Sequence, residues 1–500
     1  MNQALRRISL ACLALFLLLL ANANYVQAFE AGSLAGDPGN GRTFAAQFQY
    51  QRGPIITADG KTIAASRHVG GVYSYQRYYP RGGLYAPVTG YDTLYSTTGI
   101  ENAEDRYLAG TAPELEVRNI IDLITGKPKK GATVQLTINS VAQQAAYSAL
   151  KATGLPSGVV AIQPSTGAIL ALASYPSFNP NKLAVLDGTV LKRNYDRLNS
   201  SPSQPLLNRA ISATFPPGST FKIVTSSTAF TSGKYTPSTS VYAPTNLKLP
   251  GTRNQLINYD NLPCGNGSGH VPLIYAFTVS CNTVFGNIGM KLGAAALHRQ
   301  AARFGMNDPS LTIPLPVAQS NYVIPPGQPP SPPLTAYSAI GQYSDTVTPL
   351  QEAMFSAAIA NHGTLMKPYL VARVTAPDLT PLQTASPSTL SQAVSPDVAA
   401  KVATMMVDVT HQPYGTAYLT ASPQAAGGIS IAAKTGTAQN GINNTGLDDA
   451  VFTCFAPVGN PQIAVGVVVK GGGLGADKAA PVAVAIVKAY EHYLASQGRR

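Results

Sequence analysis

The sequence predicts a mixed α/β protein built as a membrane anchor, an N-terminal spacer domain and a larger second domain. Three observations support this prediction. The length of 500 residues suits about three domains at roughly 150 residues each. One apolar run, residues 8–29, opens the chain, and patterns of strands and helices alternate along the part that follows it. Hydrophobic residues make up 45% of the chain, which is ample for a large core.

The composition narrows the surroundings in which the protein works. Charged residues are only 12% of the chain, about half the usual share of a soluble protein. The net charge of +12 favours anionic surroundings such as a membrane surface or a cell-wall polymer. No dense Lys/Arg run with interleaved aromatic residues occurs, so nucleic acid is not expected as a partner. The four cysteines lack zinc-ligand spacing, so we expect neither a metal site nor a cofactor.

The N-terminal apolar run predicts a single membrane anchor. Residues 8–29 are long enough to span a bilayer, which takes about 20 residues. Arg6 and Arg7 precede the run, so the positive-inside rule leaves residues 1–7 in the cytoplasm and the rest of the chain outside. The alternative is a cleaved signal peptide, because residues 21–23, Ala-Asn-Ala, fit the cleavage pattern. We expect the uncleaved anchor.

Residues 30–150 are predicted to form the spacer domain. A hairpin is expected in residues 51–65, where apolar residues alternate about the turn Asp59-Gly60. A short helix is expected to begin near Glu101, and no catalytic combination of residues occurs in this region.

Residues 151–500 are predicted to form the second domain. A helical pattern ends at Gly154, and two strands surround a turn in residues 159–174. Further strands are expected at residues 429–433, 451–456 and 463–470, followed by a helix over residues 479–495.

A serine and a lysine in this domain have the spacing of a nucleophile and its base. Residues 216–222 read PPGSTFK and precede an apolar run, which predicts a helix beginning near Ser219. Lys222 follows one turn later, so the two side chains lie on one face. A serine becomes nucleophilic when a base removes its proton, and a lysine can do so if burial or another cation lowers its pKa. Taken alone, such a pair is more often part of a solvated helix surface.

Two more motifs follow in a particular order. Residues 280–282 read Ser-Cys-Asn, which places a hydroxyl and an amide two residues apart. Residues 434–437 read Lys-Thr-Gly-Thr and follow a strand pattern. A glycine on a strand lets a substrate backbone approach closely, while the lysine and the hydroxyls can hold a carboxylate. Each motif alone carries little weight, but the order S-x-x-K, S-x-N, K-T-G is much less common.

This set is typical of penicillin-binding proteins and class A β-lactamases. The chain resembles a class B penicillin-binding protein, a monofunctional D,D-transpeptidase, of the group found in actinobacteria. The resemblance extends to the segments RGPIITADGKTIA, GIENAEDRYLAG, ATFPPGSTFKIVT and IAAKTGTAQN. One departure follows K-T-G: the family usually has a segment resembling His-Ala-Trp-Phe, where residues 449–452 read Asp-Ala-Val-Phe and the chain has no Trp. Packing at that edge of the cleft, or binding of the substrate side chain, is therefore expected to differ.

The resemblance implies a fold, an activity and partners. The fold would be the penicillin-binding-protein transpeptidase or serine β-lactamase-like fold, with a mainly antiparallel sheet between helices. The activity would be peptidoglycan D,D-transpeptidation through a serine acyl-enzyme that β-lactams block, serving cell-wall synthesis and cell division. The partners would be stem peptides ending in D-Ala-D-Ala, β-lactam antibiotics, the membrane, and cell-division or wall-synthesis proteins.

The resemblance also assigns a role to each motif residue. The backbone N–H groups of Ser219 and Thr437 would hold the oxyanion. The side chains implied are Ser219 as nucleophile, Lys222 as general base, Ser280 as proton relay, Asn282 as partner of the substrate amide, and Lys434, Thr435 and Thr437 around Gly436 as the carboxylate site.

Two other functions remain open at this stage. In a D,D-carboxypeptidase or β-lactamase, water would resolve the acyl-enzyme. Class A β-lactamases place a glutamate between the second and third motifs, and the sequence offers only Glu352 there, in a segment predicted to be a structural helix. In a noncatalytic β-lactam sensor or divisome scaffold, the same pocket would bind without turnover.

The cysteines predict a disulfide between Cys264 and Cys281. They lie 17 residues apart in a chain predicted to be exported to a compartment that permits disulfides. Closing a loop of this length contributes roughly 3 kcal/mol on the chain-entropy model. The alternative is two reduced cysteines, and in either case Cys12 and Cys454 are expected to stay unpaired.

Overall fold

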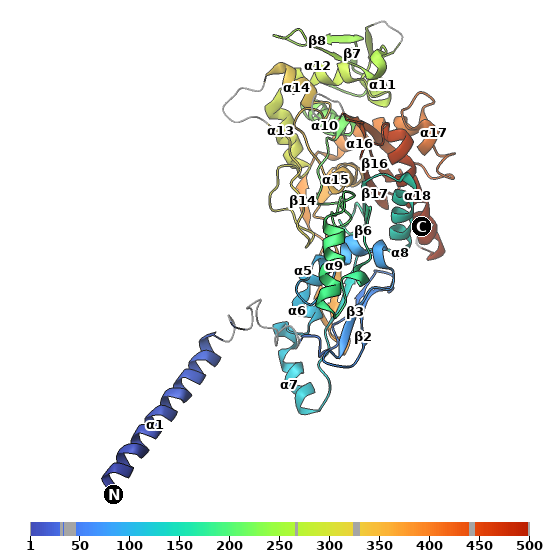
Figure 1. Ribbon diagram of the computed structural model, residues 1–500. Helices are drawn as coiled ribbons and strands as arrows, with labels where there is room; N and C mark the ends of the chain where they lie inside the picture. The colour runs from blue at the N-terminus through green and yellow to red at the C-terminus, as the bar shows by residue number, and fades with distance from the viewer. Residues whose placement is uncertain are drawn as a thin grey trace.

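The computed structural model describes residues 2–30, 34, 47–265, 269–323, 331–439 and 446–498. The N-terminal helix α1 (Asn2–Tyr25) continues as a short π-helical segment (Val26–Glu30). Residues 5–30 are apolar enough to cross a membrane, and they are not covered by the rest of the protein. The described part of the chain contains one such helix, at the place where the sequence predicts the anchor (Figure 1).

The core of the larger unit is a five-stranded antiparallel sheet. Its strands run in the order β15 (Ala432–Ala438), β16 (Asp449–Ala456), β17 (Ile463–Val469), β5 (Ser157–Ile162) and β6 (Ile169–Tyr175). Their side chains are almost all buried, which explains why the sequence runs are apolar rather than alternating.

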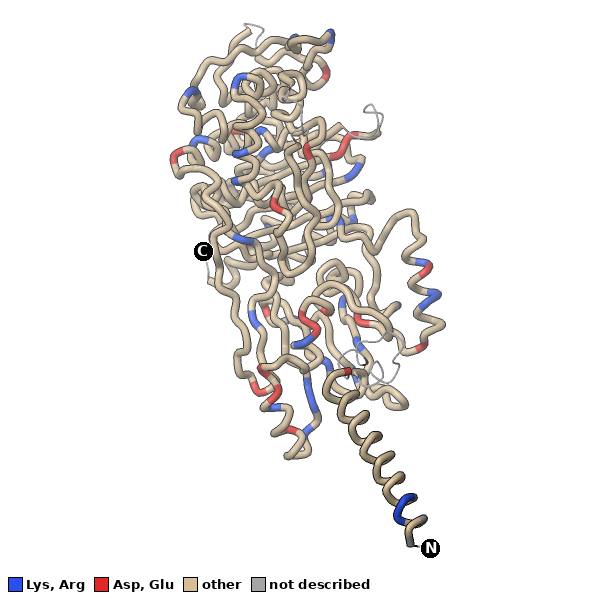
Figure 2. The backbone as a smooth tube through the Cα atoms, turned by 90° about the vertical axis from the view of Figure 1, so that its left-hand side faces the viewer, with Lys and Arg blue, Asp and Glu red and all other residues tan. Residues whose placement is uncertain are grey.

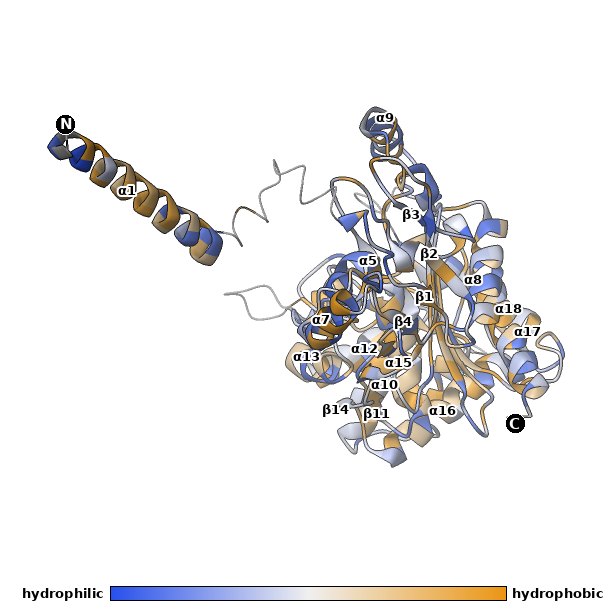
Figure 3. Ribbon diagram, turned by 90° about the horizontal axis from the view of Figure 1, so that it is seen from below, coloured by the Kyte–Doolittle hydropathy of each residue, from blue (hydrophilic) through white to orange (hydrophobic). Residues whose placement is uncertain are grey.

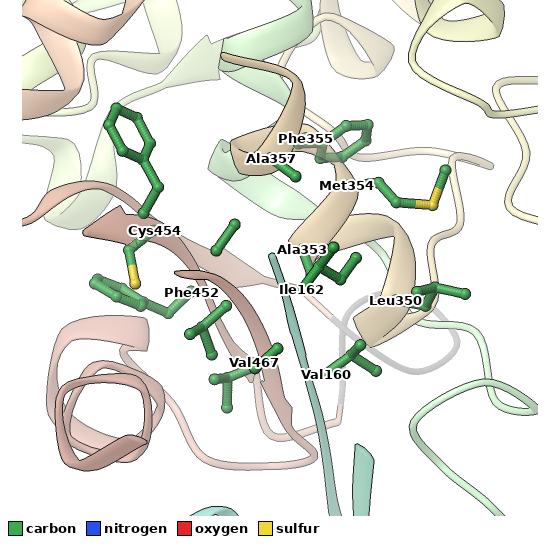
Figure 4. Close-up of a cluster of buried hydrophobic side chains, with 14 of the residues drawn as sticks. Val160, Ile162, Leu350, Ala353, Met354, Phe355, Ala357, Phe452, Cys454 and Val467 are labelled. Carbon is green, nitrogen blue, oxygen red and sulfur yellow. The ribbon is translucent and has the colours of Figure 1, made fainter. Parts of the chain in front are cut away.

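Helices cover both faces of this sheet. Helix α15 (Pro349–Ala360) packs on one face, and helices α8 (Ser140–Thr153) and α18 (Gly475–Ser496) pack on the other (Figure 1). In the core, Leu350 and Ala353 of α15 lie beside Val160 and Ile162 of β5 (Figure 4). Gly466 allows this close approach, because a Cβ there would lie 2.2 Å from the backbone N of Ala353.

Local signals explain the helix that begins this unit. The Asn139 side chain accepts hydrogen bonds from the N–H groups of Val141 and Ala142, at 3.1 and 3.0 Å, so it caps α8. The helix ends at Gly154, whose φ of 69° is the left-handed conformation of a C-terminal cap. Because α8 packs against β6 and α18, it lies with the sheet of the larger unit, whereas the predicted boundary at residue 150 assigns it to the spacer.

The spacer contains a six-stranded mixed sheet in the order β13-β12-β4-β1-β2-β3. The predicted hairpin is present: β1 (Ile55–Ile56) pairs antiparallel with β2 (Thr62–His68) across the turn at residues 59–60. Two strands come from far along the chain, since β12 (Val371–Thr375) pairs with β4 (Thr133–Leu136). The two units therefore share a sheet. The remaining strands are β3 (Tyr75–Tyr78) and β13 (Pro381–Thr384).

A buried cluster of charges joins the parts of the spacer. Glu101 accepts hydrogen bonds from Arg77 Nε at 2.6 Å and Arg52 Nε at 2.7 Å, and Arg52 also pairs with Asp105 at 2.6 Å. Burial alone would raise the pKa of Glu101, but the Arg77 and Arg52 guanidinium groups hold it below its ordinary value. Charged residues of both signs lie in the lower, spacer part of the molecule in Figure 2.

A helical subdomain stands on the opposite end of the central sheet from the spacer (Figure 1). Its helices are α10 (Lys222–Thr231), α11 (Leu273–Thr278), α12 (Asn282–Leu292), α13 (Ala294–Arg303), α14 (Pro332–Ser338) and α16 (Pro396–His411). The other elements are α4 (Ala86–Thr89), α5 (Gly99–Ala103), α6 (Asp105–Leu108), α7 (Glu116–Ile124), α9 (Gly188–Asn199) and α17 (Tyr418–Ala421), with strands β7 (Ser240–Tyr242), β8 (Asn246–Lys248), β9 (Gln255–Ile257), β10 (His270–Pro272), β11 (Thr364–Met366) and β14 (Thr389–Gln392).

Candidate active site

The three sequence motifs meet at the junction between the central sheet and the helical subdomain. Ser219 lies in a 3-10 turn (Gly218–Phe221) that leads directly into α10, so Lys222 is the first residue of the α-helix. The half-buried Ser219 hydroxyl lies 2.9 Å from the Nζ of Lys222. The sequence placed Ser219 near a helix start, and the structure refines this position to the tight turn before it.

Lys222 is fully buried and held by four oxygen atoms. Besides Ser219 Oγ, its Nζ lies 2.7 Å from the backbone O of Ser280, 3.2 Å from Ser280 Oγ and 2.8 Å from Asn282 Oδ1. The backbone and amide oxygens can only accept hydrogen bonds. A neutral amine has two N–H groups, so these two acceptors use both of them. The lone pair of a neutral Lys222 is then left for the hydroxyl of Ser219.

Ser280 lies between the two lysines. Lys434 Nζ donates to Ser280 Oγ at 2.9 Å and to the backbone O of Thr435 at 2.9 Å. Ser280 has a φ of 61°, an uncommon conformation for a residue other than glycine, Asn or Asp. Such backbone strain persists only where the surrounding structure enforces it. The hydroxyl of Ser280 thus connects Lys222 to Lys434.

Burial makes both lysines more acidic than usual. Burial, and then the charge of Lys434, lower the pKa of Lys222 well below its ordinary value. Burial lowers the pKa of Lys434 to about 7. Each lysine nitrogen lies over an aromatic ring: Lys222 Nζ is 5.5 Å from the ring centroid of Phe285, and Lys434 Nζ is 5.5 Å from that of Phe277. Neutral Lys222 at neutral pH is what a general base requires.

Strand β15 forms one wall of the site. Gly436 allows this strand to approach the Ser219 turn, because a Cβ there would lie 2.8 Å from the backbone O of Pro217. The Thr435 hydroxyl lies 2.7 Å from the hydroxyl of Thr416, and Thr437 is half-buried at the same strand. All the residues predicted for the site, from Ser219 to Thr437, therefore surround one region.

A disulfide fixes the second motif. Cys264 and Cys281 are bonded, with their Cα atoms 5.9 Å apart, and Cys281 is the N-cap residue of α12. Asn258 supports the same turn, since its Oδ1 accepts from the N–H groups of Asn282 at 2.8 Å and Thr283 at 3.1 Å. Ser280 and Asn282, on either side of the disulfide, are thereby held in place. The free cysteines are Cys12, exposed on α1, and Cys454, buried in β16.

No group of three or more His, Cys, Asp or Glu side chains in the described part of the chain is arranged to hold a metal ion.

Comparison with known proteins identifies the family. The penicillin binding protein transpeptidase domain matches residues 157–488, and the penicillin binding protein A dimerisation domain matches residues 52–134. The peptidoglycan D,D-transpeptidase PbpA of Mycolicibacterium smegmatis is 40% identical over 499 residues, covering 98% of this chain and 99% of the relative. The protein of the same name from Mycobacterium tuberculosis is 41% identical with the same coverage. This chain belongs to the penicillin-binding protein family.

Solved structures of penicillin-binding proteins confirm the predicted α/β fold. The imipenem acyl-enzyme complex of penicillin-binding protein A from M. tuberculosis matches with a TM-score of 0.83 at 40% identity, over 89% of this chain and 100% of that one. The penicillin G acyl-enzyme complex matches with a TM-score of 0.82 at 38% identity, over 88% and 100%. The resemblance inferred from the motifs is thus confirmed.

Several residues of this penicillin-binding protein site could not be predicted from the sequence. Phe277 and Phe285, Thr416 and Asn258 belong to no short motif and reach the site only through the fold. Glu352, predicted to be part of a structural helix, does lie in α15, but it is also hydrogen-bonded to Thr220, the neighbour of the nucleophile, at 2.8 Å. The sequence does not indicate this contact, because 132 residues separate Thr220 from Glu352.

The unusual segment after K-T-G is the beginning of β16. Asp449 is buried there, and its Oδ1 accepts from the N–H of Gly471 at 2.8 Å, while Val451 packs in a small cluster with Phe215 and Val468. This segment therefore lies on an inner strand of the sheet, between β15 and β17, and contains no tryptophan.

Proposed function

We propose that this protein is a peptidoglycan D,D-transpeptidase that cross-links stem peptides through an acyl-enzyme on Ser219 and that β-lactams inhibit covalently. The observation that carries the proposal is the buried Lys222 amine, 2.9 Å from the hydroxyl of Ser219. The relatives named as peptidoglycan D,D-transpeptidases support the same reaction class.

In the acylation half-reaction, Ser219 Oγ attacks the carbonyl carbon of the penultimate D-alanine. The hydroxyl proton passes to the lone pair of Lys222. The C–N bond to the terminal D-alanine then breaks, and the departing amine receives a proton by way of Ser280, which lies 3.2 Å from Lys222 and 2.9 Å from Lys434. In a β-lactam the broken C–N bond belongs to the ring, so the leaving amine stays tethered.

In the second half-reaction, the amine of another stem peptide attacks the ester carbon. Lys222 takes the proton of that amine and passes it to Ser219 Oγ as the ester bond breaks, which restores the hydroxyl of Ser219. The only glutamate between the second and third motifs, Glu352, is fully buried and bonded to Thr220, which disfavours activation of a water molecule. We therefore expect a long-lived acyl-enzyme, with the amine and not water as the acceptor.

Substrate positioning is proposed for the remaining motif residues. Lys434 and the hydroxyls of Thr435 and Thr437 bind the terminal carboxylate. Hydrogen bonds from a charged amine to a carboxylate are stronger than those between neutral groups. The N–H groups of Ser219 and Thr437 hold the oxyanion. Asn282 binds the substrate amide by its amide group while its Oδ1 anchors Lys222.

The topology and partners are part of the same proposal. The N-terminus lies in the cytoplasm, residues 8–29 cross the membrane once, and the spacer and the transpeptidase domain, which together span residues 30–500, lie outside. Arg6 and Arg7 before the apolar run support this orientation. Cell-division or wall-synthesis proteins are the proposed partners.

The decisive experiment supplies the full chain with a donor peptide ending in D-Ala-D-Ala and an amine acceptor. We expect release of D-alanine together with formation of the cross-linked peptide, and Ser219→Ala should abolish both, along with labelling by fluorescent penicillin. Release of D-alanine without a cross-link would favour a carboxypeptidase. Repeated turnover of a chromogenic β-lactam would favour a β-lactamase, and labelling without any peptide product would favour a sensor.

A further inference from the structure

The helix α7 in the spacer exposes its apolar side chains to solvent. Five of its nine residues are large and aliphatic, and every one of them is more than half exposed. Four of them lie on one face of the helix, at the i, i+3, i+4 and i+7 positions. The exposed fractions are 73% for Val117, 57% for Ile120, 54% for Ile121, 80% for Leu123 and 79% for Ile124.

The polar side of the same helix faces the protein. Arg118 pairs with Asp122 at 3.3 Å and with Asp378, beside strand β12, at 2.6 Å. The side chain of Asn119 donates to the backbone O of Gly110 at 2.9 Å. A surface helix of a soluble protein normally has the opposite arrangement. The polar contacts thus hold α7 in an orientation that presents an apolar face outward.

The apolar face lies at the end of the protein where the chain leaves the membrane. After α1 and its π-helical extension end at Glu30, the chain joins the spacer near Tyr50, whose ring lies 5.5 Å from the Nζ of Lys129. Gln51 forms a β-bridge with Lys130, and both lysines closely follow α7. Figure 3, in which the molecule is seen from below, shows the hydrophobic residues of the α7 ribbon in orange.

The charge next to α7 favours a particular partner. Lys127, Lys129 and Lys130 follow the helix within six residues of its end. A short apolar helix face flanked by lysines is typical of helices that bind the interface of a membrane containing anionic lipids. A second copy of the chain, packed about a twofold axis, would bring these lysines toward their equivalents and cause repulsion.

We propose that α7 is an interfacial helix that inserts its apolar face into the outer surface of the membrane that α1 crosses. The lysines contact anionic headgroups, and the aliphatic side chains reach the boundary of the acyl chains. The spacer is then attached to the bilayer at two points, α1 and α7. This double attachment restricts rotation of the body about the anchor and directs the transpeptidase site away from the membrane surface. The inference depends on α1 as an anchor and not on the catalytic proposal.

The absence of Trp from the sequence allows a clean test. Ile120→Trp introduces a single tryptophan on the apolar face of α7 in the full chain. The variant is reconstituted in vesicles of phosphatidylcholine and phosphatidylglycerol, with or without lipids brominated near the top of the acyl chain. We expect the brominated lipids to reduce the emission at least twofold, with a blue-shifted maximum. Ile124→Trp should behave in the same way. This second variant shows whether the result at position 120 comes from a local structural defect caused by that substitution.

Leu419→Trp is the matched control. Leu419 is 88% exposed on α17, which lies well away from α7 in Figure 1. Its emission should not change with brominated lipid. Equal, weak quenching at positions 120, 124 and 419 would overturn the proposal. A blue shift at position 120 without bromine quenching would overturn it as well, because a second copy or another protein would then cover α7. All variants should still be labelled by fluorescent penicillin, which separates this test from that of the catalytic proposal.

Discussion

Replacement of Glu352 by glutamine should stabilise the protein, increasingly so as the pH rises from 5 to 8. The hydrogen bonds of Thr220 explain why. Its hydroxyl lies 2.8 Å from both the backbone O of Pro217 and Glu352 Oε1. The hydroxyl has one proton, and the backbone oxygen can only accept it. Both contacts are satisfied when Glu352 is protonated and donates to Thr220. Glutamine can make the same donation through its amide.

The pKa of Glu352 determines the size of this stabilisation. Burial raises this pKa from 4.5 to about 8. The folded-state pKa of this acid is raised, so the unfolded chain loses its proton near pH 4.5 while the folded protein keeps it. Wild-type stability therefore falls as the pH rises between these two values, and the fall ends above pH 8. By linkage the loss is about 1 kcal/mol at pH 5 and about 4 kcal/mol at pH 8. Glu352→Gln removes this pH-dependent loss.

The assay is thermal unfolding of the full chain in detergent at pH 5 and pH 8. For the roughly 330 residues of the transpeptidase match, unfolding entropy is about 0.7 kcal/mol/K, so the change of about 3.5 kcal/mol corresponds to about 5 °C. The difference in Tm between Glu352→Gln and wild type should grow by that amount between the two pH values. Glu116→Gln, at an exposed position, should show no such growth. A difference that stays constant from pH 5 to pH 8 would refute the reasoning.

Four further experiments test the site, its disulfide and the spacer. Lys222→Ala should slow penicillin acylation by about 10²- to 10⁴-fold, measured by stopped-flow labelling, because the general base is lost. The second-order acylation rate of a carboxylate-bearing β-lactam should fall as the pH rises through about 7, where Lys434 loses its charge, and the rate of the corresponding ester should not follow that titration. Thiol counting on the unfolded, nonreduced chain should find two free thiols, since Cys264 and Cys281 are bonded, and a count of four would contradict this. Glu101→Gln should destabilise the spacer by about 3–5 kcal/mol, observed as a lower unfolding temperature, because Arg77 loses its carboxylate partner.

The sequence predicted the elements whose signals are local. The hairpin at residues 55–68 follows from alternation about an Asp-Gly turn, and α8 follows from apolar spacing with Asn139 and Gly154 at its ends. The helix expected over residues 479–495 begins earlier, at Gly475, and accommodates Pro481 in its second turn. The missed features depend on distant contacts. The addition of β12 to the spacer sheet and the contact between Glu352 and Thr220 have no local signal.

The inward polar face of α7 could not be predicted either. Its periodicity is that of any amphipathic helix, and periodicity does not say which face is buried. The answer depends on Asp378, a residue more than 250 positions later, which pairs with Arg118. The same limit applies to the aromatic rings beside the two lysines of the active site, since Phe277 and Phe285 have no distinctive spacing.

The protonation of those lysines shows what the motifs leave undetermined. The motifs supply two amines and a hydroxyl, but not which amine carries a charge. Lys222 has two oxygen neighbours that can only accept hydrogen bonds, the backbone O of Ser280 and Asn282 Oδ1. A neutral amine has two N–H groups, one for each of these acceptors, so its lone pair is left to face Ser219. Charged Lys434 has three N–H groups, which can donate to Ser280 Oγ, to the backbone O of Thr435 and to a substrate carboxylate. Burial, and then the charge of Lys434, lower the pKa of Lys222, which agrees with this division. The base and the cation of the reaction are therefore distinguished by their hydrogen-bond partners rather than by their residue type.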